Sequence, residues 1–394
     1  MKKKNIVNIY GSTGNIGSKS LRILNKYFPS YKINFLLANK NYKKLIKQVN
    51  LYNPNYVCIN DKSKIYFLKK GINNKKTKII EPENLISFIK NTYSDMSVLS
   101  ISGYESLNLL PSIFLNTKNL GIVSKECIVS GGHLFPKLNK NSINIFPLDS
   151  EHYSLSNLLN QESNIIKKIY LTASGGPFLN MQLKDIINVS FKNALNHPKW
   201  KMGYKNSIDS ATLANKCLEL IEAHYLFDIK FTNLEMIIHP ESLIHSVVEY
   251  KNYTSSLNYF YHDMFIPLYN FFNSNNLIKS LNKFPFINKK FDFSYAKNLN
   301  FFPPDRKNFP ILKIFEKIDK SMPINLIKFN CSNEFAVNLY SQNRIKYGDI
   351  HKIIDNSLSL DFTIDTNNIN NIIEFQNLYY NKLTDKILKK LWKL

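Results

Sequence analysis

The chain has few cysteines, and their spacing excludes the usual zinc and disulfide frameworks. Only four occur in 394 residues, at Cys58, Cys127, Cys217 and Cys331. They form no CxxC pair and have no histidine at the spacing typical of zinc ligands. We therefore expect reduced, mostly buried thiols in a cytosolic protein, and no cysteine nucleophile.

Long apolar runs are also missing. No window approaches 18 consecutive apolar residues, which argues against a transmembrane helix. The opening MKKKNIVNIYGSTG passes from three lysines directly into a strand-like run and leaves no room for a signal or transit peptide. The prediction is a cytoplasmic or already processed protein without a membrane partner.

Acidic residues are scarce beside basic ones, 29 against 52, so the formal net charge is +23. Such an excess fits a nucleic-acid-binding protein, which would show a steeply salt-dependent affinity for DNA. The lysines are scattered, however, and Lys, Asn, Ile, Tyr and Phe are abundant throughout, as in an AT-biased coding sequence. We therefore expect no nucleic-acid partner and a surface that favours small phosphorylated molecules.

Alternating strand and helix patterns predict an α/β protein with an N-terminal Rossmann-like, doubly wound parallel sheet. Its expected strands lie at 6–10, 33–38, 56–59, 98–101 and 120–123, with helices at 16–28 and up to about residue 49. The next region has an α+β pattern, with strands at 165–173, 234–238 and 246–250 and a helix at 211–226. Helices at 311–318, 323–342, 347–357 and 369–391 follow the proline-rich segment 301–310.

These patterns predict three domains and no internal repeat. A dinucleotide-binding domain is expected at 1–149, a central catalytic and metal-binding domain at 150–300, and a helical domain at 301–394.

A glycine-rich turn, GSTGNIG at 11–17, follows the first strand and precedes a helix. Glycines there permit a tight turn and let backbone N–H groups approach a pyrophosphate. Such a turn can be purely structural, but its position favours dinucleotide binding. After the second strand, Asn39, Lys40 and Asn41 stand where an NAD site usually has an acid. They suit a 2′-phosphate and favour NADPH, although a plain basic loop is the alternative.

Two acidic residues in LDSEH at 148–152 suggest a metal site. Asp149 and Glu151 are two residues apart, and in an extended segment they would point to the same side. Their oxygens suit a hard cation such as Mg²⁺ or Mn²⁺. A plain acidic turn is the alternative.

A downstream helix, opened by Asp209 or Ser210 as its N-cap, completes this hypothesis. It would place four polar side chains on one face, namely Thr212, Asn215, Lys216 and Glu219. Glu219 would then be the third carboxylate of the cation site, while Asn215 and Lys216 would reach an anionic substrate. Such a face is otherwise an ordinary surface.

Three further segments carry candidate functional residues. In SKECIV at 124–129, Lys125 is expected to hold a substrate oxygen or the metal-site carboxylate and Glu126 to meet the cofactor, although a solvated pair is the alternative. In ASGGPF at 173–178, the Ser174 hydroxyl and the flexible backbone can wrap a phosphate. In HPKWKMG at 197–203, a His, a Trp and a Met indicate a lid over residues 174–204. Trp200 would otherwise be a core aromatic.

Taken in order, these motifs resemble those of the 1-deoxy-D-xylulose 5-phosphate reductoisomerase family, as do IHPESLIHSVVEY and FNCSNEFAVNLY further on. The resemblance covers nearly the whole chain. It implies conversion of 1-deoxy-D-xylulose 5-phosphate to 2-C-methyl-D-erythritol 4-phosphate in non-mevalonate isoprenoid biosynthesis. It also implies NADPH, a divalent cation (Mg²⁺ or Mn²⁺, with Co²⁺ as an alternative) and a homodimer.

The resemblance also implies roles for single residues. The metal ligands would be Asp149, Glu151 and Glu219. The substrate contacts would be Lys125, Ser150, Glu151, Ser174, His197, Ser210, Asn215, Lys216 and Glu219, with Lys125, Glu151, His197 and Lys216 as catalytic residues. The cofactor contacts would be Thr13, Gly14, Asn15, Ile16, Asn39, Lys40, Asn41, Ser124, Glu126 and Gly203.

Four positions depart from the family pattern. Asn39 and Ser124 replace the usual Gly and Asn near the cofactor, and His262 and Phe265 replace Pro and Arg. No metal or substrate contact is lost, so the chemistry should survive. Another NADPH-dependent reductase, such as a semialdehyde dehydrogenase, is the rival enzyme, but it would need a catalytic cysteine, for which Cys127 and Cys217 are poorly placed.

Overall fold

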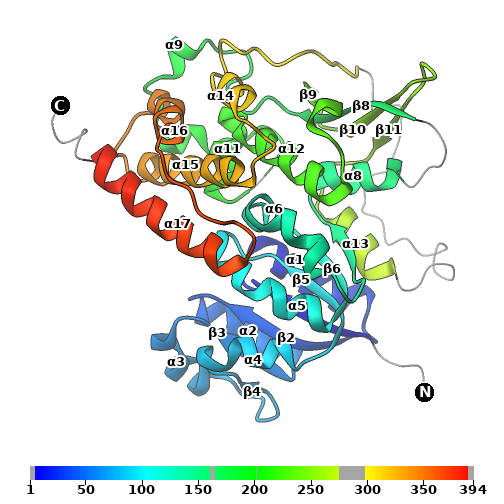
Figure 1. The fold of residues 1–394 in the computed structure, drawn as a ribbon. Coiled ribbons are helices and arrows are strands. Elements are labelled where there is room, and N and C mark those ends of the chain that lie inside the picture. The colour runs from blue at the N-terminus through cyan, green and yellow to red at the C-terminus, as the bar shows by residue number, and fades with distance from the viewer. Residues whose placement is uncertain (1–4, 160–164, 201, 275–297, 389–394) are drawn as a thin grey trace. The chain divides into compact units, whose positions relative to one another are not determined.

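The computed structural model describes residues 5–159, 165–200, 202–274 and 298–388 (Figure 1). The chain forms two compact units, each assembled from three segments. Unit 1 comprises residues 1–124, 136–153 and 263–295, and unit 2 comprises residues 125–135, 154–262 and 296–394. The division into domains at 1–149, 150–300 and 301–394 stays a prediction.

Unit 1 contains a seven-stranded sheet in the order β4-β3-β2-β1-β5-β6-β7. Every neighbouring pair is parallel. The strands are β1 Ile6–Tyr10, β2 Lys32–Ala38, β3 Tyr56–Ile59, β4 Lys78–Ile79, β5 Ser94–Leu99, β6 Thr117–Ile122 and β7 Asn144–Pro147. The chain leaves β1 toward β2 on one side and reaches β5 on the other. The predicted doubly wound α/β sheet is therefore confirmed, with its switch point at the carboxyl ends of β1 and β5.

Helices of unit 1 bury the apolar faces of this sheet. They are α1 Asn15–Tyr27, α2 Tyr42–Tyr52, α3 Ile65–Gly71, α4 Leu85–Lys90, α5 Leu110–Asn116 and α13 Phe265–Asn273, while α7 Phe135–Leu138 spans a boundary between units. The aromatic helix α13 returns to this unit from late in the sequence. Phe265 packs edge-on against Tyr27 at 5.6 Å between ring centroids, and the Tyr31 hydroxyl donates to the Phe272 carbonyl at 2.9 Å. A distant segment therefore completes the core of the nucleotide-type fold.

Unit 2 contains a four-stranded mixed sheet in the order β11-β10-β8-β9. Its strands are β8 Ile166–Ala173, β9 Leu234–Ile238, β10 Ile244–Tyr250 and β11 Ser255–Tyr259. β8 and β9 run parallel, while β10 is antiparallel to both β8 and β11. This confirms the predicted α+β character of the central region.

The helices of unit 2 include the C-terminal group that the sequence predicts. They are α6 Lys125–Gly131, α9 Leu183–Ile186, α10 Phe191–Ala194, α11 Tyr204–Thr212, α12 Ala214–Phe227, α14 Ile311–Lys317, α15 Pro323–Ser341, α16 Ile350–Leu358 and α17 Ile369–Leu383. α8 Ser150–Leu159 spans a boundary between units. The predicted last helix is shorter than 369–391: α17 ends at Leu383, a π-helical turn covers Thr384–Leu388, and residues 389–391 lie outside the described residues.

The helix predicted at 211–226 is confirmed as α12, but its predicted start is wrong. The chain forms α11 and α12, and Leu213 between them has a left-handed φ of 64°. Asp209 and Ser210 therefore lie inside α11, whose N-cap is Gly203. The Asp209 carboxylate accepts hydrogen bonds from Lys205 and Asn333. The Asp209 side chain, which the sequence pattern predicted to cap a helix, therefore makes tertiary contacts instead.

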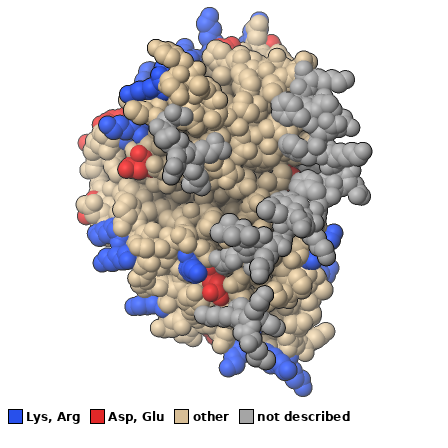
Figure 2. Space-filling model, turned by 90° about the vertical axis from the view of Figure 1, so that its right-hand side faces the viewer, with Lys and Arg blue, Asp and Glu red and all other residues tan. Residues whose placement is uncertain are grey.

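Basic side chains are dispersed on the face drawn in Figure 2, where Lys and Arg stand apart around the margin. The described residues on this face form no continuous basic stripe. Among the helices that the structure describes, none combines the length and apolar character that a bilayer crossing needs.

Candidate functional site

The glycine turn of unit 1 has a backbone that other residues could not adopt. Gly11 has a φ of +89°, and a Cβ there would lie 2.6 Å from the Ser100 carbonyl oxygen. A Cβ on Gly17 would overlap the Gly11 carbonyl. Gly14 is exposed and N-caps α1 without a side chain to cover the first N–H groups. The predicted contacts Thr13, Gly14, Asn15 and Ile16 therefore lie where a dinucleotide phosphate can approach the backbone.

The loop after β2 carries the other predicted cofactor contacts of unit 1. Asn39, Lys40 and Asn41 are all exposed. The Asn41 side chain accepts the backbone N–H of Lys44 at 3.1 Å and so caps α2. Asp61 also lies beside this loop, because its backbone N–H donates to the Asn39 carbonyl at 3.0 Å. The pKa of Asp61 is lowered, mainly by the hydrogen bond from the Ser63 side chain, and the positive charge of Lys40 lowers it further.

Ser124 is buried two residues after the end of β6. Its Oγ lies 3.0 Å from Ser106 Oγ, which donates to the Gly103 carbonyl at 2.8 Å. Ser124 therefore donates to Ser106, and a chain of hydroxyls fixes the residue that replaces the usual Asn of the resembled family.

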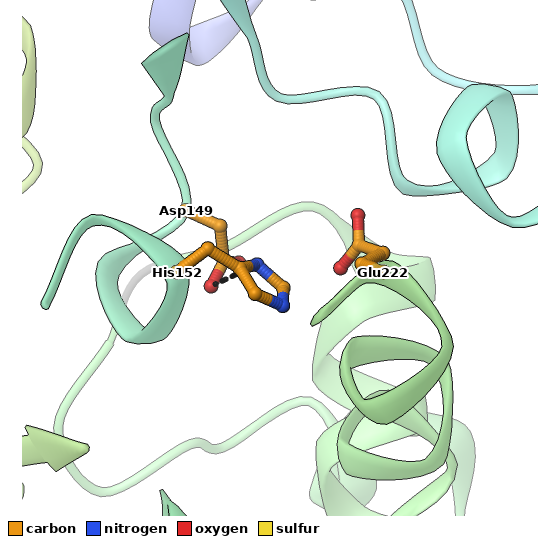
Figure 3. Close-up of side chains that lie close together, drawn as sticks. All are labelled: Asp149, His152 and Glu222. Atoms are coloured by element: carbon orange, nitrogen blue, oxygen red, sulfur yellow. Dashed lines mark ion pairs between the residues drawn. The ribbon is translucent and has the colours of Figure 1, made fainter. Parts of the chain in front are cut away.

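The acidic pair of unit 1 lies at a helix start, so the predicted extended segment is wrong. Asp149 directly precedes α8, and its Oδ1 accepts the backbone N–H of Glu151 at 3.2 Å. This hydrogen bond favours a helix beginning at Ser150. Ser150 Oγ donates to Glu151 Oε2 at 2.7 Å. The wholly buried His152 places Nδ1 3.3 Å from Asp149 Oδ1 (Figure 3). His152 was not predicted, although its spacing from Asp149 is that of one helical turn.

In unit 2, α12 carries three residues of the predicted polar face, Asn215, Lys216 and Glu219, whereas Thr212 lies in α11. Lys216 and Glu219 are buried, so this face is not an ordinary surface. Glu219 is 1% exposed and accepts hydrogen bonds from Lys216 and Asn215 on α12. Lys125 on α6 donates to Glu219 Oε1 at 3.1 Å and to Glu222 Oε2 at 3.4 Å. Glu222, also drawn in Figure 3, was not predicted, although it follows Glu219 by three residues. The result is a buried cluster of two lysines and two glutamates. The contact between Lys125 and a metal-site carboxylate was predicted.

Asn215 offers this cluster a further polar atom. Its Oδ1 is buried and has no hydrogen-bond partner among the described residues. Because a buried acceptor without a donor is costly, a donor such as a substrate hydroxyl fits at this atom.

The loop after β8 brings Ser174 and His197 together. Ser174 Oγ lies 3.1 Å from His197 Nε2 and accepts the Gly176 N–H at 3.2 Å. His197 Nδ1 accepts the backbone N–H groups of Lys199 at 3.1 Å and Trp200 at 2.9 Å. In the neutral imidazole the proton therefore resides on Nε2 and is donated to Ser174. The hydroxyl proton of Ser174 is thereby directed toward another acceptor, such as a phosphate oxygen.

Close backbone packing brings Ser210 to the same loop. Gly176 has a φ of +68°, and a Cβ on it would lie 2.7 Å from the Ser210 carbonyl oxygen. Gly176 therefore lets the loop approach the end of α11. Two hydroxyls predicted to bind one substrate belong to segments in direct contact.

Trp200 is partly buried, between two imidazoles. Its ring is edge-on to His262 at 5.8 Å and to His245 at 6.4 Å. His262 is one of the positions that depart from the family pattern. Met202 is also partly buried, whereas Gly203 is exposed. Trp200 is therefore a loop aromatic, and closure of a lid over 174–204 stays a prediction.

A buried ionic network that the sequence did not reveal lies beside this loop. Lys205 Nζ contacts Asp209 Oδ2 at 2.6 Å and Glu126 Oε1 at 3.7 Å. Asp209 Oδ1 also accepts from Asn333 Nδ2 at 2.8 Å. Burial alone would lower the pKa of Lys205, but the charges of Asp209 and Glu126 outweigh it and hold the pKa above its ordinary value. The predicted cofactor contact Glu126 is thus positioned by a lysine of α11.

A doubly wound parallel sheet with a glycine turn, together with clustered carboxylates, lysines and a Ser–His pair, defines a dinucleotide-binding α/β enzyme. Family models match in order along the chain: "1-deoxy-D-xylulose 5-phosphate reductoisomerase" at 7–132, its C-terminal domain at 145–227, and "DXP reductoisomerase C-terminal domain" at 261–381. The chain belongs to the 1-deoxy-D-xylulose 5-phosphate reductoisomerase family, as the sequence motifs predicted.

Individual relatives agree with this assignment. The reductoisomerase of Pelagibacter ubique is 39% identical over 87% of this chain and 88% of its own length. A solved reductoisomerase from Zymomonas mobilis in complex with NADPH has a TM-score of 0.86 at 26% identity, covering 97% of this chain and 99% of its own. Another, in complex with NADPH, fosmidomycin and magnesium, has a TM-score of 0.85 at 30% identity, with 99% of both chains covered.

Proposed function

We propose that this protein converts 1-deoxy-D-xylulose 5-phosphate to 2-C-methyl-D-erythritol 4-phosphate, using NADPH and a divalent cation, in non-mevalonate isoprenoid biosynthesis. The observation that carries this function is the ordered match of its family over segments of both units. Incubation of the purified protein with the ketose phosphate, NADPH and Mg²⁺ should yield the branched polyol phosphate, identified by NMR. Recovery of unchanged ketose phosphate would contradict the proposal.

The residues of unit 1 fit NADPH. A solved relative holds this cofactor, and here the exposed Gly14 leaves the start of α1 open to a phosphate. Lys40 and Asn41 supply a cation and an amide in the loop where an NAD site usually carries an acid. We propose that this loop binds the adenosine end of NADPH and that Ser124, Glu126 and Gly203 contact its nicotinamide end.

Asp149, Glu151 and Glu219 are the proposed metal ligands. Their three carboxylates would supply only oxygen donors, which suits the Mg²⁺ held by a solved relative. The alternative set of Asp149, His152 and Glu222 contains an imidazole, which suits softer metals better. Within unit 1, the Glu151 N–H and His152 orient Asp149, a supporting arrangement typical of metal sites. We therefore place His152 beside the ligands and not among them.

The lysines around Glu219 can pair with its carboxylate in the absence of a cation and with the substrate when a cation is bound. Lys125 and Lys216 both contact its carboxylate. When Glu219 ligates a cation, these ammonium groups become available to anionic oxygens of the substrate. We propose that they stabilise the negative charge that develops there, which makes Lys125 and Lys216 catalytic residues.

The remaining polar groups position the substrate. Ser174 and Ser210 offer hydroxyls to its phosphate, Asn215 Oδ1 accepts from a substrate hydroxyl, and Ser150 orients Glu151. His197 holds Ser174 through Nε2, and its role as a catalytic residue is part of the proposal. When bound, the cation supplies Lewis acidity for the rearrangement and NADPH supplies the hydride. The protein contributes orientation and charge.

A homodimer and a cytoplasmic location complete the proposal. The four cysteines, all buried and free, support a reducing compartment. Sedimentation of the purified protein at twice the mass of the chain is the expected result, and sedimentation at the mass of one chain would contradict the dimer.

Lys40 should determine the preference for NADPH over NADH. Replacing Lys40 with Asp puts a negative charge beside a 2′-phosphate, so NADPH should bind at least tenfold more weakly while NADH changes little. Titration of both cofactors against wild type and variant measures this. Equal affinity of the wild-type protein for the two cofactors would remove the basis for the assignment.

Trp200 should report closure of the lid. Replacing Trp392, which lies outside the described residues, with Phe leaves Trp200 as the only tryptophan. Its fluorescence should then change when fosmidomycin, Mg²⁺ and NADPH are added, because lid closure excludes water. Trp200→Phe should raise KM or lower kcat by on the order of tenfold, about 1.4 kcal/mol. An unchanged signal with native kinetics in Trp200→Phe would make Trp200 part of a static loop.

A further inference from the structure

Lys44 of α2 reaches across unit 1 to the glycine turn. Its Nζ donates to the Thr13 carbonyl at 2.8 Å, and its backbone N–H is held by the side chain of Asn41. An ammonium group has three donors, and Thr13 is the hydrogen-bond partner of Nζ among the described residues. The side chain is half-buried. Lys44 therefore presents a positioned cation directly beside the residue that precedes Gly14.

The charges around Lys44 distinguish it from Lys40. Lys40 acts on Asp61, whose pKa its charge helps to lower, so part of its field is already opposed by a carboxylate. No ion pair involving Lys44 occurs among the described residues. Its neighbours on α2 are Lys43 and Lys47, both exposed, which add further positive charge. Lys44 is thus a cation that lies beside a turn of the phosphate-binding type and has no carboxylate partner among the described residues. Such a cation can donate a charge-assisted hydrogen bond to a phosphate oxygen.

We propose that Lys44 is a further cofactor-binding residue, which donates a charge-assisted hydrogen bond to a phosphate group of NADPH. It does so from a position beside Thr13 in the glycine turn, where its hydrogen bond to the Thr13 carbonyl keeps the ammonium in place. This inference rests on the proposed use of NADPH. Two phosphate sources share the chemistry: the 2′-phosphate on the adenosine ribose and the pyrophosphate.

Equilibrium binding of NADPH and NADH, measured by calorimetry on the full chain, tests this role. Lys44→Met keeps the aliphatic stem and removes the charge, and Lys44→Arg retains the charge. Lys43→Met is the matched control, one residue away on the same helix. Lys44→Met should weaken NADPH binding on the order of tenfold, whereas Lys44→Arg should recover most of the affinity and Lys43→Met should bind as wild type.

Comparison of the two cofactors separates the two phosphates. Loss of affinity for NADPH alone assigns Lys44 to the 2′-phosphate, and equal losses for NADPH and NADH assign it to the pyrophosphate. Wild-type affinity of Lys44→Met for both cofactors would overturn the inference. If the wild-type protein itself bound neither cofactor, the proposed function would fail, and the two failures are therefore distinguishable.

Discussion

Glu219→Gln should lose cation affinity and turnover together, because the substitution keeps the shape of the side chain and removes one charge of three. We expect a decrease of ten- to a hundredfold at limiting Mg²⁺, comparable to other losses at metal sites. Excess Mg²⁺ should restore part of the activity, since the defect lies in binding. Turnover measured across a Mg²⁺ titration gives both quantities.

A matched control separates this effect from a general loss of acidic charge. Glu235 on β9 is more exposed and pairs with Lys168 at 3.1 Å, so Glu235→Gln should titrate with Mg²⁺ as the wild type does. Because Glu219 is buried against two lysines, the melting temperature of Glu219→Gln must be compared as well. A folded Glu219→Gln that turns over like wild type at limiting Mg²⁺ would rule out the three-carboxylate site.

Lys205→Met should produce the largest loss of stability. Asp209 is fully buried and Glu126 is 5% exposed. Removing the ammonium therefore leaves two buried carboxylates without their cation. Among the described residues, Asp209 then keeps the side-chain hydrogen bond from Asn333. Breaking a buried ion pair in this way costs about 3–5 kcal/mol. The urea midpoint for unfolding of unit 2, followed by Trp200 fluorescence in the Trp392→Phe background, measures the change.

The double variant Lys205→Met/Asp209→Asn tests the cause. Removing the stranded charge should recover part of the lost stability, because the burial cost of a neutral amide is far smaller than that of a carboxylate. If Lys205→Met unfolds at the wild-type urea concentration, the network contributes no net stability. If the double variant is less stable than Lys205→Met by the full cost of a second substitution, the two residues are not coupled.

Local signals in the sequence were sufficient for the nucleotide-type fold. Gly11 and Gly17 are required by contacts within one strand-turn-helix, so their spacing predicted the turn. The strands around them have buried, mostly apolar residues, which predicted the parallel sheet. β4, with two residues, and β7, which ends at a proline, were too short to give a pattern. The return of α13 to unit 1 has no local signal at all.

The candidate site was predictable in composition but not in backbone geometry. The order of the motifs predicted the family. The comparisons confirm this family, together with the fold, the activity and the cofactors. The roles of single residues stay predictions. The break at Leu213 was missed because a left-handed leucine is unusual and has no marker in the sequence. The bond between Asp209 and Asn333 spans 124 positions in the chain, and such pairs arise only from the tertiary fold.

Consumption of NADPH, followed by its absorbance, tests the central claim most directly. The account predicts that NADPH is oxidised when 1-deoxy-D-xylulose 5-phosphate is added, that a chelator stops the reaction, and that added Mg²⁺ or Mn²⁺ restores it. Omitting the ketose phosphate should leave NADPH unchanged. Oxidation that continues at the same rate in excess chelator, or no oxidation with ketose phosphate and cation both present, would contradict the account.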